Sequence, residues 1–171
     1  MRKKESVASK EIEERKIYGV VAVIQSLDNR ILLIQETKDK PEYDKRVGDL
    51  SNPTETIEKG ETIAEALARL LEEEVGVCEG MVFDLEKDWI GDYRISGGYW
   101  GRAFLVHYQG MADSLVDFQA KEGEVINHQW VDPSEVRELP RRAGVLEVVE
   151  DFLQGSRGVI REMCSPGFRQ K

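Results

Sequence analysis

The sequence predicts a single α/β domain, and two observations support this. A chain of 171 residues has the length of one domain and is long enough to bury a core. Runs rich in β-branched and aromatic residues alternate with segments whose apolar residues have helical spacing. Strands and helices are therefore expected to share one core.

The first elements are two strands, because residues 17–24 and 31–35 are β-rich runs. Between them, Leu27-Asp28-Asn29-Arg30 is a good turn sequence, so the two runs predict a hairpin. Residues 1–16 are mostly charged or small, and we expect them to form an N-terminal arm. We expect the domain proper to cover residues 17–155.

A helix is predicted over residues 63–75. Thr62 and Glu65 form a capping-box pair at its start, in which each side chain accepts from the other's backbone N–H. Gly76 follows the last helical residue and suits a left-handed C-terminal cap. The helix should therefore end at Gly76.

The remaining elements follow from the same patterns. Strands are expected at 81–86, 89–95, 99–108 and before Trp130-Val131, and helices at 133–138 and 143–153. Beyond Gly155, Gly, Ser and Pro interrupt every pattern, so residues 156–171 are expected to form a flexible tail.

One carboxylate in the 63–75 helix stands out. The apolar stripe of that helix consists of Ile63, Ala66, Leu67, Leu70 and Leu71. Glu74 falls within the same arc at about 100° per residue. An ionised carboxylate is costly to bury unless a cation compensates it, and Mg²⁺ prefers oxygen ligands. The alternative is that Glu72, Glu73 and Glu74 are a solvated charge run at a helix end.

The spacing of these residues resembles the Nudix box, the signature of the Nudix hydrolase family. That box runs Gly, five residues, Glu, seven residues, Arg-Glu-aliphatic, one residue, Glu-Glu, one residue, Gly-aliphatic. Seven of its nine defined positions match, at Glu61, Arg69, Leu71, Glu73, Glu74, Gly76 and Val77. Two positions depart: Glu55 replaces the opening Gly, and Leu70 replaces the Glu that follows Arg69. The site has thus lost a central carboxylate.

The resemblance implies a Nudix-type α/β/α sandwich around a mixed β-sheet. It implies a pyrophosphohydrolase with Mg²⁺ or Mn²⁺ held by Glu73, Glu74 and Glu58. Catalytic candidates are Glu73 and two carboxylates before the Trp130 strand, Glu122 and Glu124, which are equally consistent with an exposed acidic turn. Structural roles in the box fall to Gly60, Glu61, Arg69 and Gly76.

Several aromatic and basic residues have two interpretations. Tyr93, Tyr99 and Trp100 are able to stack on a nucleobase, although aromatic residues in strands more often pack in the core. Arg94 and Arg102 are candidates to bind phosphate or to form ion pairs. His107 and His128, as single histidines, are expected to be structural.

Three functions fit this pattern. The first is hydrolysis of a nucleoside diphosphate linked to another moiety. The second is a non-catalytic nucleotide-binding or regulatory module, which the changes at Glu55 and Leu70 would permit. The third, an isomerase on the same fold, lacks a counterpart of its cysteine and glutamate chemistry in this sequence.

The net charge of −9 argues against electrostatic binding of nucleic acid, so we expect a small-molecule nucleotide as partner. The sequence contains no apolar run long enough to cross a bilayer. Cys78 and Cys164 have no metal-ligand spacing, which favours a reducing, cytoplasmic location. Homodimers are common in the family, but no residue pattern decides whether this chain forms one.

Overall fold

The structure is a computed structural model that describes residues 15–35, 37, 39, 46–76, 79–94, 98–118 and 127–162. Its strands are β1 (Ile17–Gln25), β2 (Ile31–Gln35), β3 (Leu50–Ser51), β4 (Thr54–Thr56), β5 (Met81–Val82), β6 (Trp89–Arg94), β7 (Trp100–Tyr108), β8 (Asn127–Val131) and β9 (Val159–Glu162). Its helices are α2 (Ile63–Leu70) and α3 (Val145–Leu153), with a π-helical turn η2 (Leu71–Val75) and 3₁₀ turns η4 (Ala112–Ser114) and η5 (Pro133–Glu138).

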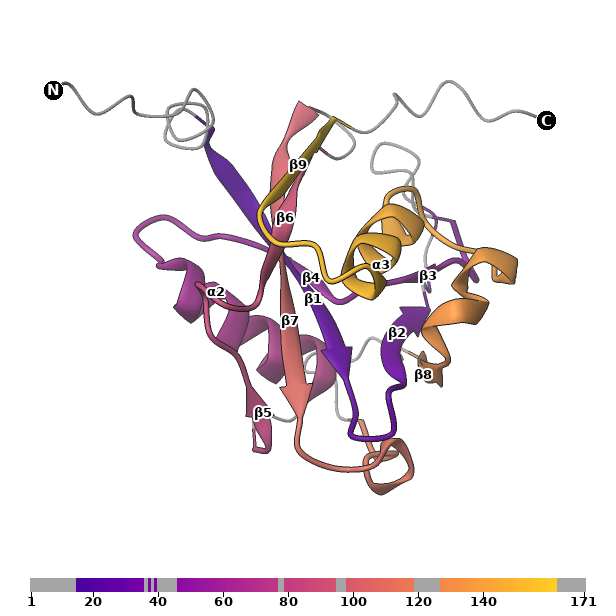
Figure 1. Ribbon diagram of the computed structural model, residues 1–171. Helices are drawn as coiled ribbons and strands as arrows, with labels where there is room; N and C mark the ends of the chain where they lie inside the picture. The colour runs from indigo at the N-terminus through magenta and orange to yellow at the C-terminus, as the bar shows by residue number, and fades with distance from the viewer. Residues whose placement is uncertain are drawn as a thin grey trace, which may run out of the picture.

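The described strands form one mixed sheet, whose main order is β3-β2-β1-β7-β6-β9. In its centre β1 runs parallel to β7, with Val21 opposite Ala103. Strands β2 and β4 pair antiparallel with β1, and β8 pairs antiparallel with β2. Figure 1 shows that this sheet curls between the helices. Mixed pairing of this kind matches the expected fold class.

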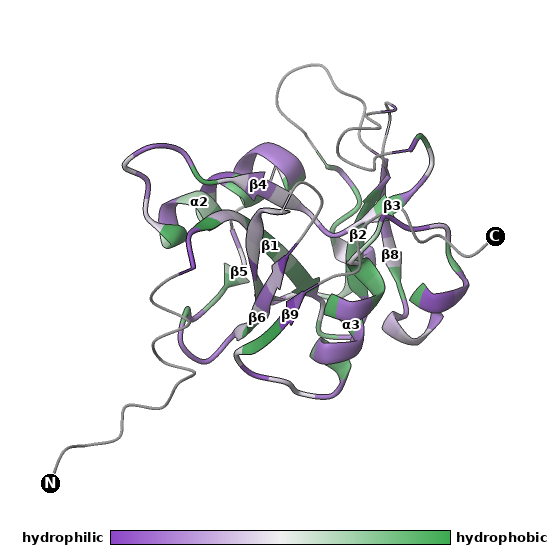
Figure 2. Ribbon diagram, turned by 90° about the horizontal axis from the view of Figure 1, so that it is seen from above, coloured by the Kyte–Doolittle hydropathy of each residue, from purple (hydrophilic) through white to green (hydrophobic). Residues whose placement is uncertain are grey.

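Strand β1 divides the core into two parts because successive side chains of a strand point to opposite faces. Val21 and Val23 pack in one cluster with residues of α3 such as Val148. Val20 and Ala22 pack in the other cluster with residues of α2 and η2. The two helices therefore cover opposite faces of the sheet (Figures 1 and 2). The predicted α/β/α sandwich around a mixed sheet is confirmed.

Most predicted elements lie where the sequence placed them, and the predicted 31–35 strand coincides with β2. The strand predicted at 81–86 is shorter, since only Met81–Val82 pair with β7. The Oδ1 atom of Asp84 accepts hydrogen bonds from the backbone N–H groups of Glu86 and Lys87 at 2.9 and 3.0 Å. This Asx-type turn ends the strand.

The expectation of a flexible tail from residue 156 is wrong for Val159–Glu162, which form β9 beside β6. Two features hold β9 in place. Gly91 lets the strands approach, since a Cβ there would lie 2.5 Å from the Cγ2 and carbonyl oxygen of Val159. Arg161 donates two hydrogen bonds of 2.6 Å to Asp151 of α3. Gly and Ser around residue 156 therefore form a connection and do not end the fold.

The predicted N-terminal arm lies outside the described residues except for Arg15 and Lys16. Arg15 donates to the buried carboxylate of Asp92 at 3.2 Å, and Asp92 also accepts from Arg102 and Trp89. Residue 15 is thus attached to the sheet. In the described ranges, no helix combines the length and apolar character that crossing a bilayer requires.

Candidate active site

The predicted caps of the helix over residues 63–75 are present. Thr62 Oγ1 accepts from the Glu65 N–H at 3.2 Å, and Glu65 Oε2 accepts from the Thr62 N–H at 3.1 Å. Gly76 has φ of 80° and ends the helix. Gly60 lies in the preceding turn with φ of 78°, a left-handed conformation that favours glycine. The capping prediction is confirmed at both ends.

The last turn of this helix departs from α geometry. Leu71–Val75 form a π-helical turn, and the Gly76 N–H bonds to the Leu71 carbonyl five residues back. This turn carries Glu72, Glu73 and Glu74. π-helical turns inside α-helices are rare and are frequent at functional sites. The carboxylates of the box therefore lie on irregular backbone.

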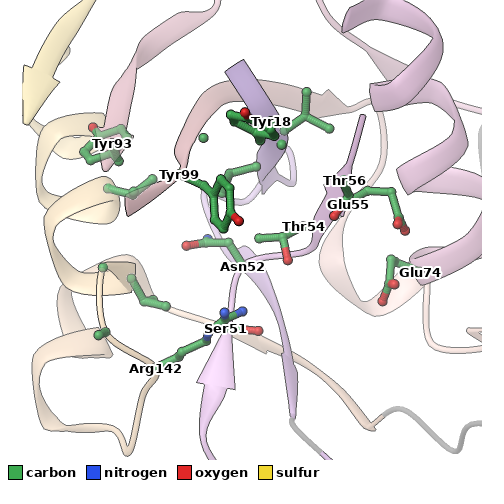
Figure 3. A pocket seen from close by; sticks show the side chains of 18 residues that line it. Tyr18, Ser51, Asn52, Thr54, Glu55, Thr56, Glu74, Tyr93, Tyr99 and Arg142 are labelled. Carbon is green, nitrogen blue, oxygen red and sulfur yellow. The ribbon is translucent and has the colours of Figure 1, made fainter. Parts of the chain in front are cut away.

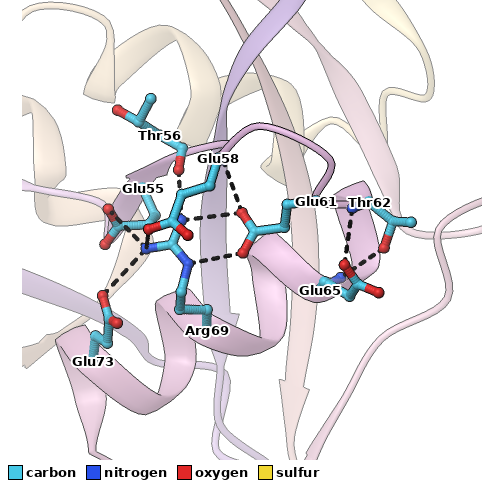
Figure 4. A network of polar contacts seen from close by, with 8 residues as sticks. All are labelled: Glu55, Thr56, Glu58, Glu61, Thr62, Glu65, Arg69 and Glu73. Carbon is cyan, nitrogen blue, oxygen red and sulfur yellow. Dashed lines mark hydrogen bonds and ion pairs between the residues drawn. The ribbon is translucent and has the colours of Figure 1, made fainter.

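Arg69 contacts four acidic residues in and around the box (Figure 4). Its Nε donates to Glu61 at 2.9 Å, and its Nη2 donates to the Thr56 carbonyl at 2.6 Å. Its Nη1 lies 3.3 Å from Glu55, 3.8 Å from Glu58 and 3.2 Å from Glu73. Arg69 thus fixes the loop before the helix to the helix itself.

These contacts change the protonation equilibria of both sides. The hydrogen bond from Arg69 lowers the pKa of Glu61, and the Glu58 backbone N–H adds to this shift. The hydrogen bond to Glu61 in turn raises the pKa of Arg69 above its ordinary value, and the charge of Glu55 reinforces this shift. Both groups are therefore firmly charged at neutral pH.

Leu70 does not face an ion site. It is 0% exposed and packs in the apolar cluster with Leu67, Phe104 and Val106. The position that carries a Glu in the box pattern therefore belongs to the hydrophobic core in this chain. No compensating polar group is needed there, because the leucine is apolar.

Glu74 lines a cavity of about 560 Å³ beside the sheet (Figure 3). Glu55 of β4 lines the same cavity, so the residue that replaces the opening Gly of the box brings a carboxylate to the Glu74 side. The polar and aromatic residues around the rest of the cavity are Tyr18, Ser51, Asn52, Thr54, Thr56, Tyr93, Tyr99 and Arg142. Sequence patterns did not indicate Tyr18, Asn52 or Arg142, because each lies on a separate element.

Glu55 reaches the cavity because residues 54–56 form a strand. Pro53-Thr54-Glu55 stands where the family has Pro-Gly-Gly, and β-branched Thr favours extended backbone. Strand β4 pairs with β1, with Gly19 opposite Thr56 and Val21 opposite Thr54. A Cβ at Gly19 would lie 3.2 Å from the Glu55 carbonyl oxygen, so glycine permits this close approach. The sequence shows that Glu55 replaces the Gly of the box, but it does not show that the Glu55 side chain lies at the cavity.

The structure separates the predicted metal ligands. Glu74 lines the cavity, whereas Glu73 and Glu58 contact Arg69. Within the described residues, no three His, Cys, Asp or Glu side chains form a metal-binding group. The predicted bases Glu122 and Glu124 lie outside the described residues, as does Val77 of the box.

Two of the ambiguous aromatic residues have separate places. Tyr93 is 1% exposed and donates its hydroxyl to Asp151 at 2.8 Å, so it belongs to the core while touching the cavity. Tyr99 is 48% exposed and contacts Tyr18 edge to face, with ring centroids 4.8 Å apart. Tyr18 itself is 39% exposed. Tyr18 and Tyr99 therefore present aromatic surface at the cavity.

The ambiguous basic residues and histidines have structural contacts. Arg102 binds Asp92, and Arg94 pairs with Glu162 of β9 at 3.2 Å. His107 Nε2 lies 3.1 Å from Asp88, and His128 Nε2 donates to the Glu74 carbonyl at 2.7 Å. His128 thereby supports the backbone of the π-helical turn. These contacts agree with the ion-pair and structural interpretations.

Comparisons with known proteins agree with this geometry. The NUDIX domain profile matches residues 15–152. The chain therefore belongs to the Nudix domain family. No match was found among the curated proteins.

Solved structures show the same fold at low sequence identity. The MutT protein from Methanosarcina mazei Go1 is 19% identical, with a TM-score of 0.60 over 82% of this chain and 96% of that one. An Ap4A hydrolase binary complex from C. elegans is 16% identical, with a TM-score of 0.62 over 80% and 96%. The NUDIX domain of Shewanella oneidensis NrtR, complexed with ADP ribose, is 14% identical, with a TM-score of 0.54 over 87% and 98%.

Proposed function

We propose that this chain is a pyrophosphohydrolase that cleaves a nucleoside diphosphate linked to another moiety with the help of Mg²⁺ or Mn²⁺. The observation that carries the proposal is the cavity in which Glu74 of the box meets Glu55 and two exposed tyrosines. Its volume of about 560 Å³ lies within the usual range for small-molecule sites. The ADP ribose in one structural relative supports a nucleotide as ligand class.

The donor set fits a hard divalent cation on the Glu74 side of the cavity. Mg²⁺ typically uses one or two protein carboxylates and completes its shell with water and substrate phosphates. Glu74 and Glu55 provide two carboxylates at one cavity, and Glu73 lies in the same helical turn as Glu74. Glu55 and Glu73 both contact Arg69 Nη1, so each would have to turn from that guanidinium to bind the ion. Affinity for the ion in the absence of substrate should therefore be weak.

A bound cation would polarise a phosphoryl oxygen and lower the pKa of a coordinated water. In the reaction, the oxygen of water forms a bond to phosphorus, and the bond from phosphorus to the bridging oxygen breaks. The bridging oxygen leaves on the second phosphoryl group, and the proton of the water passes to a base. Leu70 cannot accept that proton, so Glu122, Glu124 and Glu73 stay the candidates for this step.

The exposed tyrosines suit the nucleoside part of such a substrate. Tyr18 and Tyr99 already contact each other edge to face, so a nucleobase would stack on the free surface of the pair and would not insert between the rings. Stacking of bases on aromatic side chains depends little on which base is present. These residues therefore support a nucleotide substrate without selecting one base.

Glu74→Gln tests the proposal, with Glu72→Gln as the matched control, because Glu72 lies in the same π-helical turn and does not line the cavity. Calorimetric titration with Mn²⁺ should show weak binding to the wild type and the control, and binding at least tenfold weaker to Glu74→Gln. Glu74→Gln should also turn over nucleotide sugars, dinucleoside polyphosphates and ADP ribose more slowly than the wild type and Glu72→Gln do. Equal affinity for Mn²⁺ in the two variants would remove Glu74 from the site.

A second function, nucleotide binding without catalysis, is favoured by the burial of Leu70 in the core. The two functions differ in the product. A catalytic protein cleaves its bound nucleotide into two phosphorylated products when Mn²⁺ is added, and a coupling phosphatase then releases phosphate from them. A binding module would bind the same compound and leave it intact after prolonged incubation.

A further inference from the structure

The two sides of the cavity differ in charge. Glu55 and Glu74 lie together on one side, and Arg142 lies on the opposite side near Ser51 (Figure 3). Asn52 and Thr54 lie between them. An anion bound beside Arg142 is therefore separated from the two carboxylates that would repel it.

The N-terminus of α3 faces the cavity on the Arg142 side, since Ala143, Gly144 and Val145 line it. The N-cap residue Gly144 has φ of 93° and no side-chain hydrogen bond to the helix. The Val145 N–H bonds to the Arg142 carbonyl at 3.3 Å, and the N-terminal end of a helix carries partial positive charge. Together with an arginine, this arrangement suits phosphate or another small anion.

Asn52 supplies an independent observation. It is 2% exposed and lines the cavity. Within the described part of the chain its Nδ2 has no hydrogen-bond partner. A buried donor without an acceptor costs about 1–3 kcal/mol, so such groups are uncommon unless a ligand satisfies them. The missing partner is an acceptor, which a phosphate oxygen provides.

Glu147 is the acidic residue of the first turn of α3, so its charge offsets part of the positive potential at that helix end. It is not among the residues that line the cavity. Its charge acts on Arg161 of β9, where it contributes to the raised pKa of that guanidinium.

We propose that Arg142, the N-terminus of α3 and Asn52 bind a second anionic group of the substrate, of the phosphate class, away from the diphosphate at Glu55 and Glu74. This inference rests on the proposed function, because the same cavity holds both groups. It narrows the substrate class to nucleotides that carry a negatively charged group beyond the scissile diphosphate.

Inorganic phosphate is the probe for this site, titrated calorimetrically in EDTA at constant ionic strength. The wild type should bind phosphate, and Arg142→Gln should bind it at least tenfold more weakly, which corresponds to about 1.4 kcal/mol. Arg142→Lys should retain part of the affinity, because the charge remains. Arg137→Gln is the control, since Arg137 lies on η5, pairs with Glu150 and does not line the cavity.

A further pair of variants separates this site from the metal site. Glu74→Gln should leave phosphate affinity unchanged or raise it, because it removes negative charge from the cavity. Asn52→Asp, which keeps the size of the side chain and adds negative charge, should weaken phosphate binding. The proposal is overturned if the wild type does not bind phosphate or if Arg142→Gln binds it as tightly as the wild type. A wild-type protein that binds phosphate but does not bind Mn²⁺ would instead contradict the proposed function.

Discussion

Leu70→Glu restores the carboxylate that the family pattern places after Arg69, and its effect should be loss of stability without gain of metal binding. Leu70 is fully buried among apolar side chains. Replacing it forfeits about 1.5–3 kcal/mol of apolar burial. Keeping the new carboxyl neutral at pH 7 costs about 3.7 kcal/mol, since its ordinary pKa is about 4.3 and each pH unit corresponds to 1.36 kcal/mol.

Together these terms amount to about 5–7 kcal/mol, a large share of the stability of a typical domain. For a chain of this size, each kcal/mol lowers Tm by about 2–4 °C, so the expected fall is about 10–28 °C. The milder Leu70→Gln provides a folded comparison if Leu70→Glu does not fold. Because the folded-state pKa of the new carboxyl is raised, the deficit should shrink as the pH falls toward 5.

Thermal unfolding with and without Mn²⁺ is the assay, and Leu67→Glu is the matched control. Leu67 is also fully buried in the same cluster, three residues earlier on α2. Both variants should lose stability, and Mn²⁺ should rescue neither. Selective rescue of Leu70→Glu by Mn²⁺ would refute the reasoning, because it would mean that position 70 reaches the ion.

Two further variants test the charged contacts. Arg161→Leu should destabilise the protein by about 1–3 kcal/mol at pH 7, a figure reduced for the half-exposed arginine, because it leaves Asp151 buried without its cation. Burial acts to raise the pKa of Asp151, but hydrogen bonds from Arg161 and Tyr93 outweigh it and lower that pKa. The stability that Asp151 contributes is therefore present above pH 4 and is lost as the pH falls further. In urea unfolding, the difference in unfolding free energy between wild type and Arg161→Leu should become smaller in acid. Arg69→Gln should lower Tm at pH 7, because Arg69 lowers the pKa of Glu61. The difference in Tm between wild type and Arg69→Gln should become smaller in acid, and an unchanged Tm at pH 7 would contradict the role of Arg69.

The sequence predicted elements whose causes are local. The capping box at Thr62 and the glycine at residue 76 act within a few residues, so the limits of that helix were predictable. Strand β2 was predictable because a short buried run between turn residues has few alternatives. The family resemblance supplied the sandwich, since sequence order alone does not define which helix covers which face.

Features that depend on contacts between distant residues were not predictable. A helical wheel places Glu74 in the arc of Leu70, but it does not show that Glu73 turns to Arg69 while Glu74 turns to the cavity. The π-helical turn changes the spacing on which the wheel depends. Arg142 became a candidate only because the fold brings it to the same cavity as Glu55 of β4, and no spacing rule connects those residues.

Strand β9 also determines which edge the sheet presents to other molecules. It lies beyond residue 152, where the family match ends, and it takes the position next to β6. Without it, six residues of β6 would present unpaired backbone groups, a template for association with other β-strands. The edge is instead a four-residue strand that ends in Arg161 and Glu162, and short charged edges resist such pairing. A chain cut at the family boundary should therefore aggregate more readily than the 171-residue chain.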